Sequence, residues 1–278
     1  MSAADHASSA ENVSTADRRL IVLDLDGTVL YPDETLSPGV VTAIAQARAA
    51  GHEVMIATGR SWRTTEHIQD QLQMQPDYVV CSNGAVTLAR TESGYTQARV
   101  ETFDATEVLT LLREHLPNAN YLVELADGSR RYTNHLDDWD MEAAERVDFA
   151  ELAAQPVCRV VVVSPDDGEQ DFVDLVSRIG LNEVTYAVGW TAWLDIAPQG
   201  VDKGTALDLV RQDLGVAPEH VIVIGDGRND IGMFQWAVRG GGRAVAMAES
   251  ADEARDAATE FTTSVADGGV AAVLRSVS

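Results

Sequence analysis

Cysteine, basic residues and long apolar runs are all scarce in this sequence, and each scarcity excludes a class of protein. Only two cysteines occur, Cys81 and Cys158, without disulfide-framework or metal-ligand spacing, so we expect buried free thiols in a reducing compartment. No run of 18 apolar residues is present to span a membrane. Lys and Arg number 20 against 44 Asp and Glu, and a formal charge of −24 repels nucleic acid and anionic membrane surfaces. We therefore expect a cytoplasmic protein with neither nucleic-acid nor membrane partners.

The rest of the composition indicates a globular chain with a polar N-terminal segment. A hydrophobic content of 45% over 278 residues suffices for one or two domains with a real core. Residues 1–18 are rich in Ala, Ser, Asp and Glu and lack an apolar core. This segment fits neither a signal peptide nor a membrane span, so we predict a disordered tail.

Strand-like and helix-like segments alternate in two separate parts of the chain. Apolar runs of strand length, spaced by helical patterns, occur at 20–23, 53–57 and 78–82 and again at 220–224 and 243–247. Such alternation predicts parallel strands with helical crossovers. We therefore predict an α/β fold whose Rossmann-like parallel-sheet core combines residues 19–85 and 199–278.

The pattern changes between residues 86 and 198. Polar strands with turn signals at 92–94 and 127–128 replace the buried runs, 157–163 is an apolar strand, and a helical pattern covers 164–179. These features predict a largely antiparallel α+β unit. The unit interrupts the core, so we predict an inserted domain at 86–198.

Two carboxylates follow the first strand of the core. Asp24 and Asp26 come directly after it, and Gly27 lets the backbone turn away from the sheet. Ligands of α/β sheets bind at the carboxyl ends of the strands, and residues two apart on a strand share one side. Carboxylates that receive a phosphoryl group need a cation, and Mg²⁺ binds carboxylates together with substrate phosphate. A solvated acidic turn is the alternative interpretation.

Further polar residues follow other strands or begin helices. Thr58-Gly59 ends the second strand, Lys203 begins a helix, and Asp226, Asn229 and Asp230 follow the strand at 220–224. If all lie at one edge of the sheet, they meet in one crevice. Taken singly, Thr58 could be a helix cap, Lys203 a solvated residue and the acidic run a charged first turn. A lysine at a helix start is unfavourable to the helix dipole, which supports a functional role for Lys203.

The motifs DLDGT, ATGR, DKGTAL and GDGRND occur in that order. Each is weak alone, but together they resemble the haloacid dehalogenase (HAD) phosphohydrolase superfamily, specifically its Cof-type branch, over about residues 19–278. The resemblance implies that the insertion at 86–198 is an α/β cap that closes over the substrate and sets specificity.

The resemblance also implies roles for individual residues. Asp24 would be the nucleophile that accepts the phosphoryl group, and Asp26 the general acid/base. Asp24, the main-chain carbonyl of Asp26, and Asp226 would hold Mg²⁺, with Asp230 in support. The phosphate-binding residues, of which Lys203 is also counted as catalytic, would be Leu25, Thr58, Gly59 through its amide, Lys203 and Asn229.

Two regions leave the roles of their residues open. Where the family has a small Gly-Asn-Ala run, this chain has Ala248-Glu249-Ser250, which predicts an extra carboxylate near the rim of the crevice. In the insertion, the candidate substrate contacts are Arg130, Arg131, Asn134 and His135, although a solvated hairpin explains most of them better.

The leading hypothesis is a Mg²⁺-dependent phosphomonoesterase that acts on a small phosphorylated metabolite, such as a sugar phosphate, through an aspartyl phosphate. A phosphomutase that uses the same intermediate is the first alternative. A non-catalytic phosphate-binding or signalling module is the second, although the complete set of acid/base, lysine and metal ligands argues against it. The oligomeric state stays open.

Overall fold

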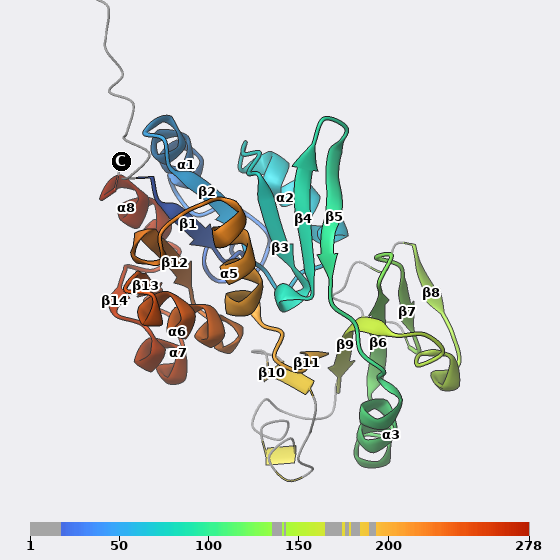
Figure 1. Ribbon diagram of the computed structural model, residues 1–278. Coiled ribbons are helices and arrows are strands. Elements are labelled where there is room, and N and C mark those ends of the chain that lie inside the picture. The colour runs from blue at the N-terminus through green and yellow to red at the C-terminus, as the bar shows by residue number, and fades with distance from the viewer. Residues whose placement is uncertain are drawn as a thin grey trace, which may run out of the picture.

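Three sheets organise the described part of the chain in the computed structural model (Figure 1). The structure describes residues 18–134, 141, 143–164, 174–175, 178, 184–188 and 193–277. The strand orders are β14-β13-β12-β1-β2, β3-β4-β5 and β10-β11-β9-β6-β7-β8. The predicted tail, residues 1–18, lies outside the described residues except for Arg18.

The first sheet is the parallel core predicted from the sequence. β1 (Leu20–Leu23) pairs in parallel with β12 (Val221–Gly225) on one side and with β2 (Glu53–Ile56) on the other. β13 (Arg243–Ala246) and β14 (Glu260–Phe261) continue the sheet beyond β12. A parallel bridge between Ala57 and Val80 connects it to β3 (Tyr78–Cys81). β1 is thus central, which explains why all four of its residues are apolar and buried.

Helices cover both faces of this sheet, and the alternation of side chains along β1 assigns them to a face. Ile21 and Leu23 share a hydrophobic cluster with α1 (Val40–Ala49), α2 (Trp62–Gln71) and α8 (Gly269–Arg275). Leu20 and Val22 share the opposite cluster with α5 (Lys203–Asp213), α6 (Ile231–Arg239) and α7 (Asp252–Ala257). The Rossmann-like fold predicted for the core is therefore confirmed.

The hairpin of β4 (Val86–Thr91) and β5 (Gly94–Val100) lies against the core. β4 pairs with β3 in antiparallel register, and Val86 and Leu88 pack in the same cluster as Ile21. We therefore propose that the insertion begins after Val100 and not at residue 86. The limit at 198 remains as predicted from the sequence.

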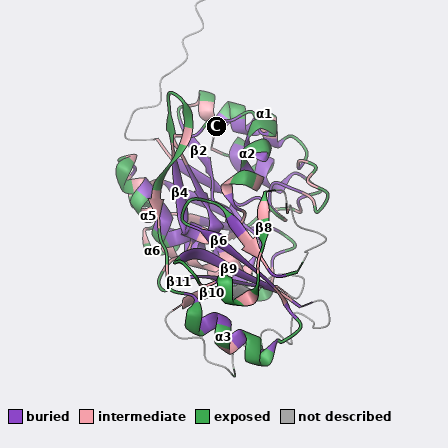
Figure 2. Cartoon of the chain, turned by 90° about the vertical axis from the view of Figure 1, so that its right-hand side faces the viewer, coloured by how far each residue is buried: buried purple, intermediate pink, exposed green. Residues whose placement is uncertain are grey.

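The third sheet forms the inserted unit. Its strands are β6 (Asn120–Leu125), β7 (Arg130–Tyr132), β8 (Ala144–Arg146), β9 (Val157–Val163), β10 (Val184–Val188) and β11 (Trp193–Pro198). All neighbouring pairs are antiparallel except β7 and β8. α3 (Thr106–His115) packs on one face, and Figure 2 shows the buried strands above this partly exposed helix. The helix predicted at 164–179 lies almost wholly outside the described residues.

Both cysteines are buried free thiols, as predicted. Cys81 lies in β3 and Cys158 in β9, and burial raises the pKa of each thiol. Within the described part of the chain, no helix has both the length and the apolar character needed to cross a membrane.

Candidate active site

Lys203 joins the carboxylates that follow two central strands. It is the first residue of α5 and is fully buried, and its Nζ donates hydrogen bonds to Asp24 Oδ1 (2.5 Å) and to Asp230 Oδ1 (2.7 Å). Burial alone lowers the pKa of Lys203, but the charges of Asp230 and Asp24 outweigh it and raise the pKa. The lysine therefore stays charged.

Local structure fixes the position of Lys203. Asp202 caps α5, because its Oδ1 accepts a hydrogen bond from the amide of Thr205 at 2.8 Å. The turn after β3 presses against this cap: a Cβ at Gly84, where φ is +103°, would lie 2.2 Å from the carbonyl oxygen of Asp202. Only glycine permits that approach, which brings the end of β3 next to the start of α5.

Asp24, Asp226 and Asp230 form a buried carboxylate cluster in which one ligand atom from each lies within 4.8 Å of the others. Asp230 is occupied on both oxygens, because Oδ1 accepts from Lys203 and Oδ2 accepts from the amides of Asp226 and Gly227, each at 2.9 Å. Asp226 Oδ1 accepts a hydrogen bond from Thr28 Oγ1 at 3.1 Å. Asp24 Oδ2 accepts none from the residues that the structure describes.

The cluster carries more negative charge than Lys203 can offset. Burial and then the neighbouring Asp230 raise the pKa of Asp24 to about 7. Burial and then Asp24 and Asp230 raise the pKa of Asp226 to about 8. Carboxylate oxygens are the donors that Mg²⁺ prefers, and a bound cation would relieve the repulsion. Asp24 and Asp226 therefore fit a hard divalent cation, while Asp230 orients its neighbours.

Three of the residues predicted to bind phosphate gather around Asn83. The main-chain N–H of Asn83 donates to the carbonyl of Thr58 at 3.0 Å, and Asn229 Nδ2 donates to the side-chain Oδ1 of Asn83 at 3.2 Å. A Cβ at Gly59 would lie 3.2 Å from Asn83 Oδ1, so a larger residue at position 59 would crowd the side-chain amide of Asn83. Thr58 is fully buried, and its hydroxyl accepts from the amide of Arg60 at 3.1 Å.

Leu25 can serve a ligand only through its main chain. Its side chain is buried in the core, and its carbonyl accepts hydrogen bonds from the amides of Thr28, Val29 and Leu30. These bonds fold the DLDGT loop tightly after β1.

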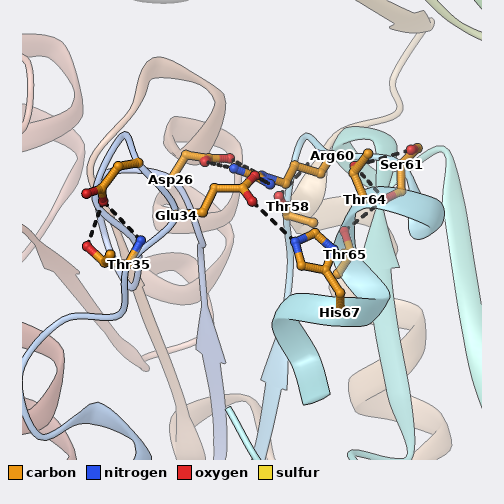
Figure 3. Close-up of polar contacts among 10 residues, drawn as sticks. Asp26, Glu34, Thr35, Thr58, Arg60, Ser61, Thr64, Thr65 and His67 are labelled. Carbon is orange, nitrogen blue, oxygen red and sulfur yellow. Dashed lines mark hydrogen bonds and ion pairs between the residues drawn. The ribbon is translucent and has the colours of Figure 1, made fainter. Parts of the chain in front are cut away.

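The Asp26 side chain is not part of the buried cluster of Asp24, Asp226 and Asp230, although its charge acts on Asp24. Its side chain is 54% exposed and both oxygens accept from Arg60, Nε to Oδ2 at 2.8 Å and Nη2 to Oδ1 at 2.5 Å. Arg60 also bonds to Glu34, which in turn contacts His67 Nε2 at 3.3 Å. Figure 3 shows the carboxylates of Asp26 and Glu34 together at the guanidinium end of Arg60.

The cap candidates and the extra carboxylate have different surroundings. Arg130 is buried, contrary to the solvated-hairpin interpretation, whereas Asn134 is exposed and Arg131 pairs with Glu145 at 3.4 Å. His135 lies outside the described residues. The exposed Glu249 accepts a hydrogen bond from the amide of Val265 at 3.0 Å, which gives it a structural role.

Sequence reasoning missed Thr28, Arg60 and Asn83. Thr28 and Arg60 belong to motifs whose neighbouring residues were singled out, so their position was a usable signal. Asn83 precedes a glycine at the end of a strand, a signal that indicates only a turn. Its φ of 51° is left-handed, a conformation that asparagine tolerates better than most residues.

Comparison with known proteins gives consistent matches over nearly the whole chain. A profile described as haloacid dehalogenase-like hydrolase matches residues 21–274. The chain is 26% identical over 264 residues to the 5-amino-6-(5-phospho-D-ribitylamino)uracil phosphatase YitU of Bacillus subtilis, covering 92% of this chain and 96% of that protein. It is 28% identical over 250 residues to the pyridoxal phosphate phosphatase YbhA of Escherichia coli, covering 85% and 91%.

Solved structures share the fold. The HAD subclass IIB sugar phosphatase BT4131 matches with a TM-score of 0.76 at 18% identity, over 93% of this chain and 98% of that one. A haloacid dehalogenase-like hydrolase from B. subtilis matches with a TM-score of 0.77 at 22% identity, over 92% and 99%. The predicted superfamily, fold class and class of enzyme, a phosphatase, are thereby confirmed.

Proposed function

The chain belongs to the haloacid dehalogenase-like hydrolase family, and we propose that it is a Mg²⁺-dependent phosphomonoesterase that acts through an aspartyl phosphate. The observation that carries this proposal is the buried Lys203, which bonds to Asp24 and Asp230 beside Asp226. A buried carboxylate next to a fixed cation and a vacant lone pair is suited to attack an electrophile whose charge must be neutralised.

In the first step, Asp24 attacks phosphorus and the bond between phosphorus and the ester oxygen breaks. Asp26 gives its proton to the leaving oxygen, so the alcohol departs neutral and the phosphoryl group stays on Asp24. Lys203 faces Asp24 and offsets charge on the transferred group.

In the second step, a water molecule gives a proton to Asp26 and attacks phosphorus. The bond between phosphorus and Asp24 breaks, inorganic phosphate leaves, and both aspartates return to their starting states. We assign the phosphoryl oxygens to Thr58, Gly59, Asn229 and the main chain of Leu25.

We assign Mg²⁺ to Asp24, Asp226 and the main-chain carbonyl of Asp26, with Asp230 in support. When bound, Mg²⁺ neutralises charge on the phosphoryl oxygens. The carboxylate cluster and its raised pKa values support this assignment, because they indicate unbalanced negative charge at the site.

We propose a small phosphorylated metabolite as the substrate, with the insertion acting as the cap. A phosphate-release assay tests the proposal on sugar phosphates, pyridoxal phosphate and 5-amino-6-(5-phospho-D-ribitylamino)uracil, with Mg²⁺ and with EDTA. We expect release that requires Mg²⁺ and is lost in Asp24→Asn. Release that persists in EDTA would refute the metal assignment, and release by folded Asp24→Asn would refute the nucleophile. Recovery of an isomeric phosphate ester in place of free phosphate would instead indicate a mutase.

A further inference from the structure

Asn83 connects two parts of the molecule that are far apart in sequence. It follows β3 in the short helical turn Ser82–Gly84, between the core and the third sheet. Its Oδ1 accepts from Asn229 Nδ2 at 3.2 Å, and its Nδ2 donates to Asp195 Oδ2 of β11 at 2.8 Å. One amide therefore touches both a residue of the phosphate site and a residue of the cap.

Asp195 is held firmly by the cap itself. Arg159 of β9 donates to both of its oxygens, Nε to Oδ1 at 2.8 Å and Nη2 to Oδ2 at 2.7 Å. Asp195 and Arg159 are 5% and 4% exposed, so this bidentate pair is buried. Paired with an arginine that can only donate, the carboxylate of Asp195 can only accept hydrogen bonds.

This fixed acceptor determines the direction of the two amides that follow. Asn83 must turn its NH₂ group toward Asp195, which leaves its carbonyl oxygen facing Asn229. Asn229 must then turn its own NH₂ group toward Asn83. One of its two N–H bonds is used there, and the second is left on the same side for another acceptor.

A phosphoryl oxygen needs a donor, so the direction of the Asn229 amide decides whether this residue attracts or repels phosphate. Without the constraint, the amide could turn by half a rotation and present its carbonyl oxygen to the anion. We propose that Asn83 is a positioning residue that transmits the polarity of the cap carboxylate Asp195 to Asn229, so that docking of the cap orients a phosphate-binding amide. This inference rests on the proposed phosphate-binding role of Asn229.

The neighbouring Ser82 offers a matched control. Its Oγ donates to the buried Glu124 of β6 at 2.8 Å, which is also a hydrogen bond between core and cap, and its φ of 49° is left-handed like that of Asn83. Ser82→Ala removes this bond without touching the Asn229 chain. Asn83→Gly removes the amide and keeps the left-handed backbone.

The experiment measures the Kd of inorganic phosphate by calorimetry on the full chain with Mg²⁺, after thermal unfolding has confirmed that each variant is folded. We expect Asn83→Gly to weaken phosphate binding about tenfold and Ser82→Ala by about twofold or less, because only the former frees Asn229. Equal weakening in the two variants would mean that cap docking alone matters, and the proposal would be overturned.

Removal of the acceptor at residue 195 gives the sharper test. Asp195 Oδ2 accepts from both Arg159 Nη2 and Asn83 Nδ2, so in Asp195→Asn the carbonyl oxygen of the new amide stays at that place and keeps both bonds. We therefore expect Asp195→Asn to bind phosphate within about twofold of the wild type, and Asp195→Ala, which has no acceptor for Asn83, to bind it about tenfold more weakly. Asp195→Ala no weaker than Asp195→Asn would overturn the proposal.

Asn229→Ala separates this inference from the proposed function. If Asn229→Ala leaves the phosphate Kd unchanged, the phosphate-binding role of Asn229 is wrong and the inference falls with it. If Asn229→Ala weakens binding while Asn83→Gly and Asp195→Ala do not, the proposed function stands and the inference alone is refuted.

Discussion

Replacement of Asp226 with asparagine should stabilise the metal-free protein. Without a cation, Asp226 faces Asp24 and Asp230, with only Lys203 to offset them, and ligand oxygens of the three carboxylates lie within 4.8 Å of one another. At that separation and an effective dielectric constant of about 20, two like charges repel by about 3 kcal/mol. Lys203 cancels about one of the two repulsions, and the new amide loses about 1 kcal/mol by leaving a buried N–H unpaired. A net gain of about 2 kcal/mol remains.

The gain requires that Asp226 be ionised. Its pKa is raised to about 8 by burial and by the two neighbouring aspartates, so the carboxylate is charged at about pH 9 and mostly neutral at about pH 6. About 2 kcal/mol corresponds to a Tm increase of roughly 4–8 °C in a chain of this size. Calorimetry in EDTA should show this increase at the higher pH and little change at the lower one.

Mg²⁺ should reverse the order of stability. At about 100 times its Kd the cation stabilises a protein that binds it by about 2.7 kcal/mol, and Asp226→Asn lacks one of the ligands that we propose. Glu219→Gln is the control, because it removes one exposed charge before β12, at the end of that strand opposite Asp226. A less stable Asp226→Asn at about pH 9 in EDTA would refute the electrostatic reasoning. An undiminished response to Mg²⁺ would remove Asp226 from the metal site.

Three further outcomes are expected. Lys203→Met keeps the apolar stem and removes the cation that faces Asp24, so kcat measured at saturating Mg²⁺ should fall by about 10²- to 10³-fold, and a smaller change would return Lys203 to a structural role. Asp26→Asn should lower the turnover of an alkyl phosphate by about 10²- to 10⁴-fold and that of a p-nitrophenyl ester by less, and intact-mass measurement should detect aspartyl phosphate on Asp24. Equal losses for the two esters would assign the acid/base role to another residue. In EDTA the wild type should become less stable to urea as the pH rises from about 4 to about 8. The native pKa values of Asp24 and Asp226 exceed 3.8, so the native state binds more protons than the unfolded state between these pH values. Stability that increases over this range would contradict the two shifts.

The core and the convergence of the site could be predicted because both follow from local pattern and sheet geometry. Strands buried on both faces have continuous apolar runs, as in β1, where all four residues are fully buried. Parallel strands also share one carboxyl edge, so residues that follow β1 and β12 meet whatever their distance in sequence. The hydrogen bonds of Lys203 to Asp24 and Asp230 are the result.

The position of the β4–β5 hairpin and the hydrogen bonds of Asn83 could not be predicted. The polarity of a residue indicates whether it is exposed, but not which residue it contacts. β4 buries Val86 and Leu88 but exposes Arg90 and Thr91, and this mixed pattern looks the same beside β3 as in a separate domain. Asn83 makes its side-chain contacts with residues 146 and 112 positions away, and no local pattern records such distances.

The bidentate contact of Arg60 with Asp26 bears on the acid/base role that we propose for Asp26. Each oxygen of Asp26 accepts one hydrogen bond from Arg60, so a contact with the leaving oxygen competes with these two bonds. Arg60 has a second carboxylate in Glu34, which stays its partner when one Asp26 oxygen is released. Asp26 is 54% exposed and Arg60 is 19% exposed, so solvent screens this ion pair in part. The bidentate contact therefore holds Asp26 near Asp24, on which its charge acts, and Glu34 keeps Arg60 paired when Asp26 turns toward the leaving oxygen.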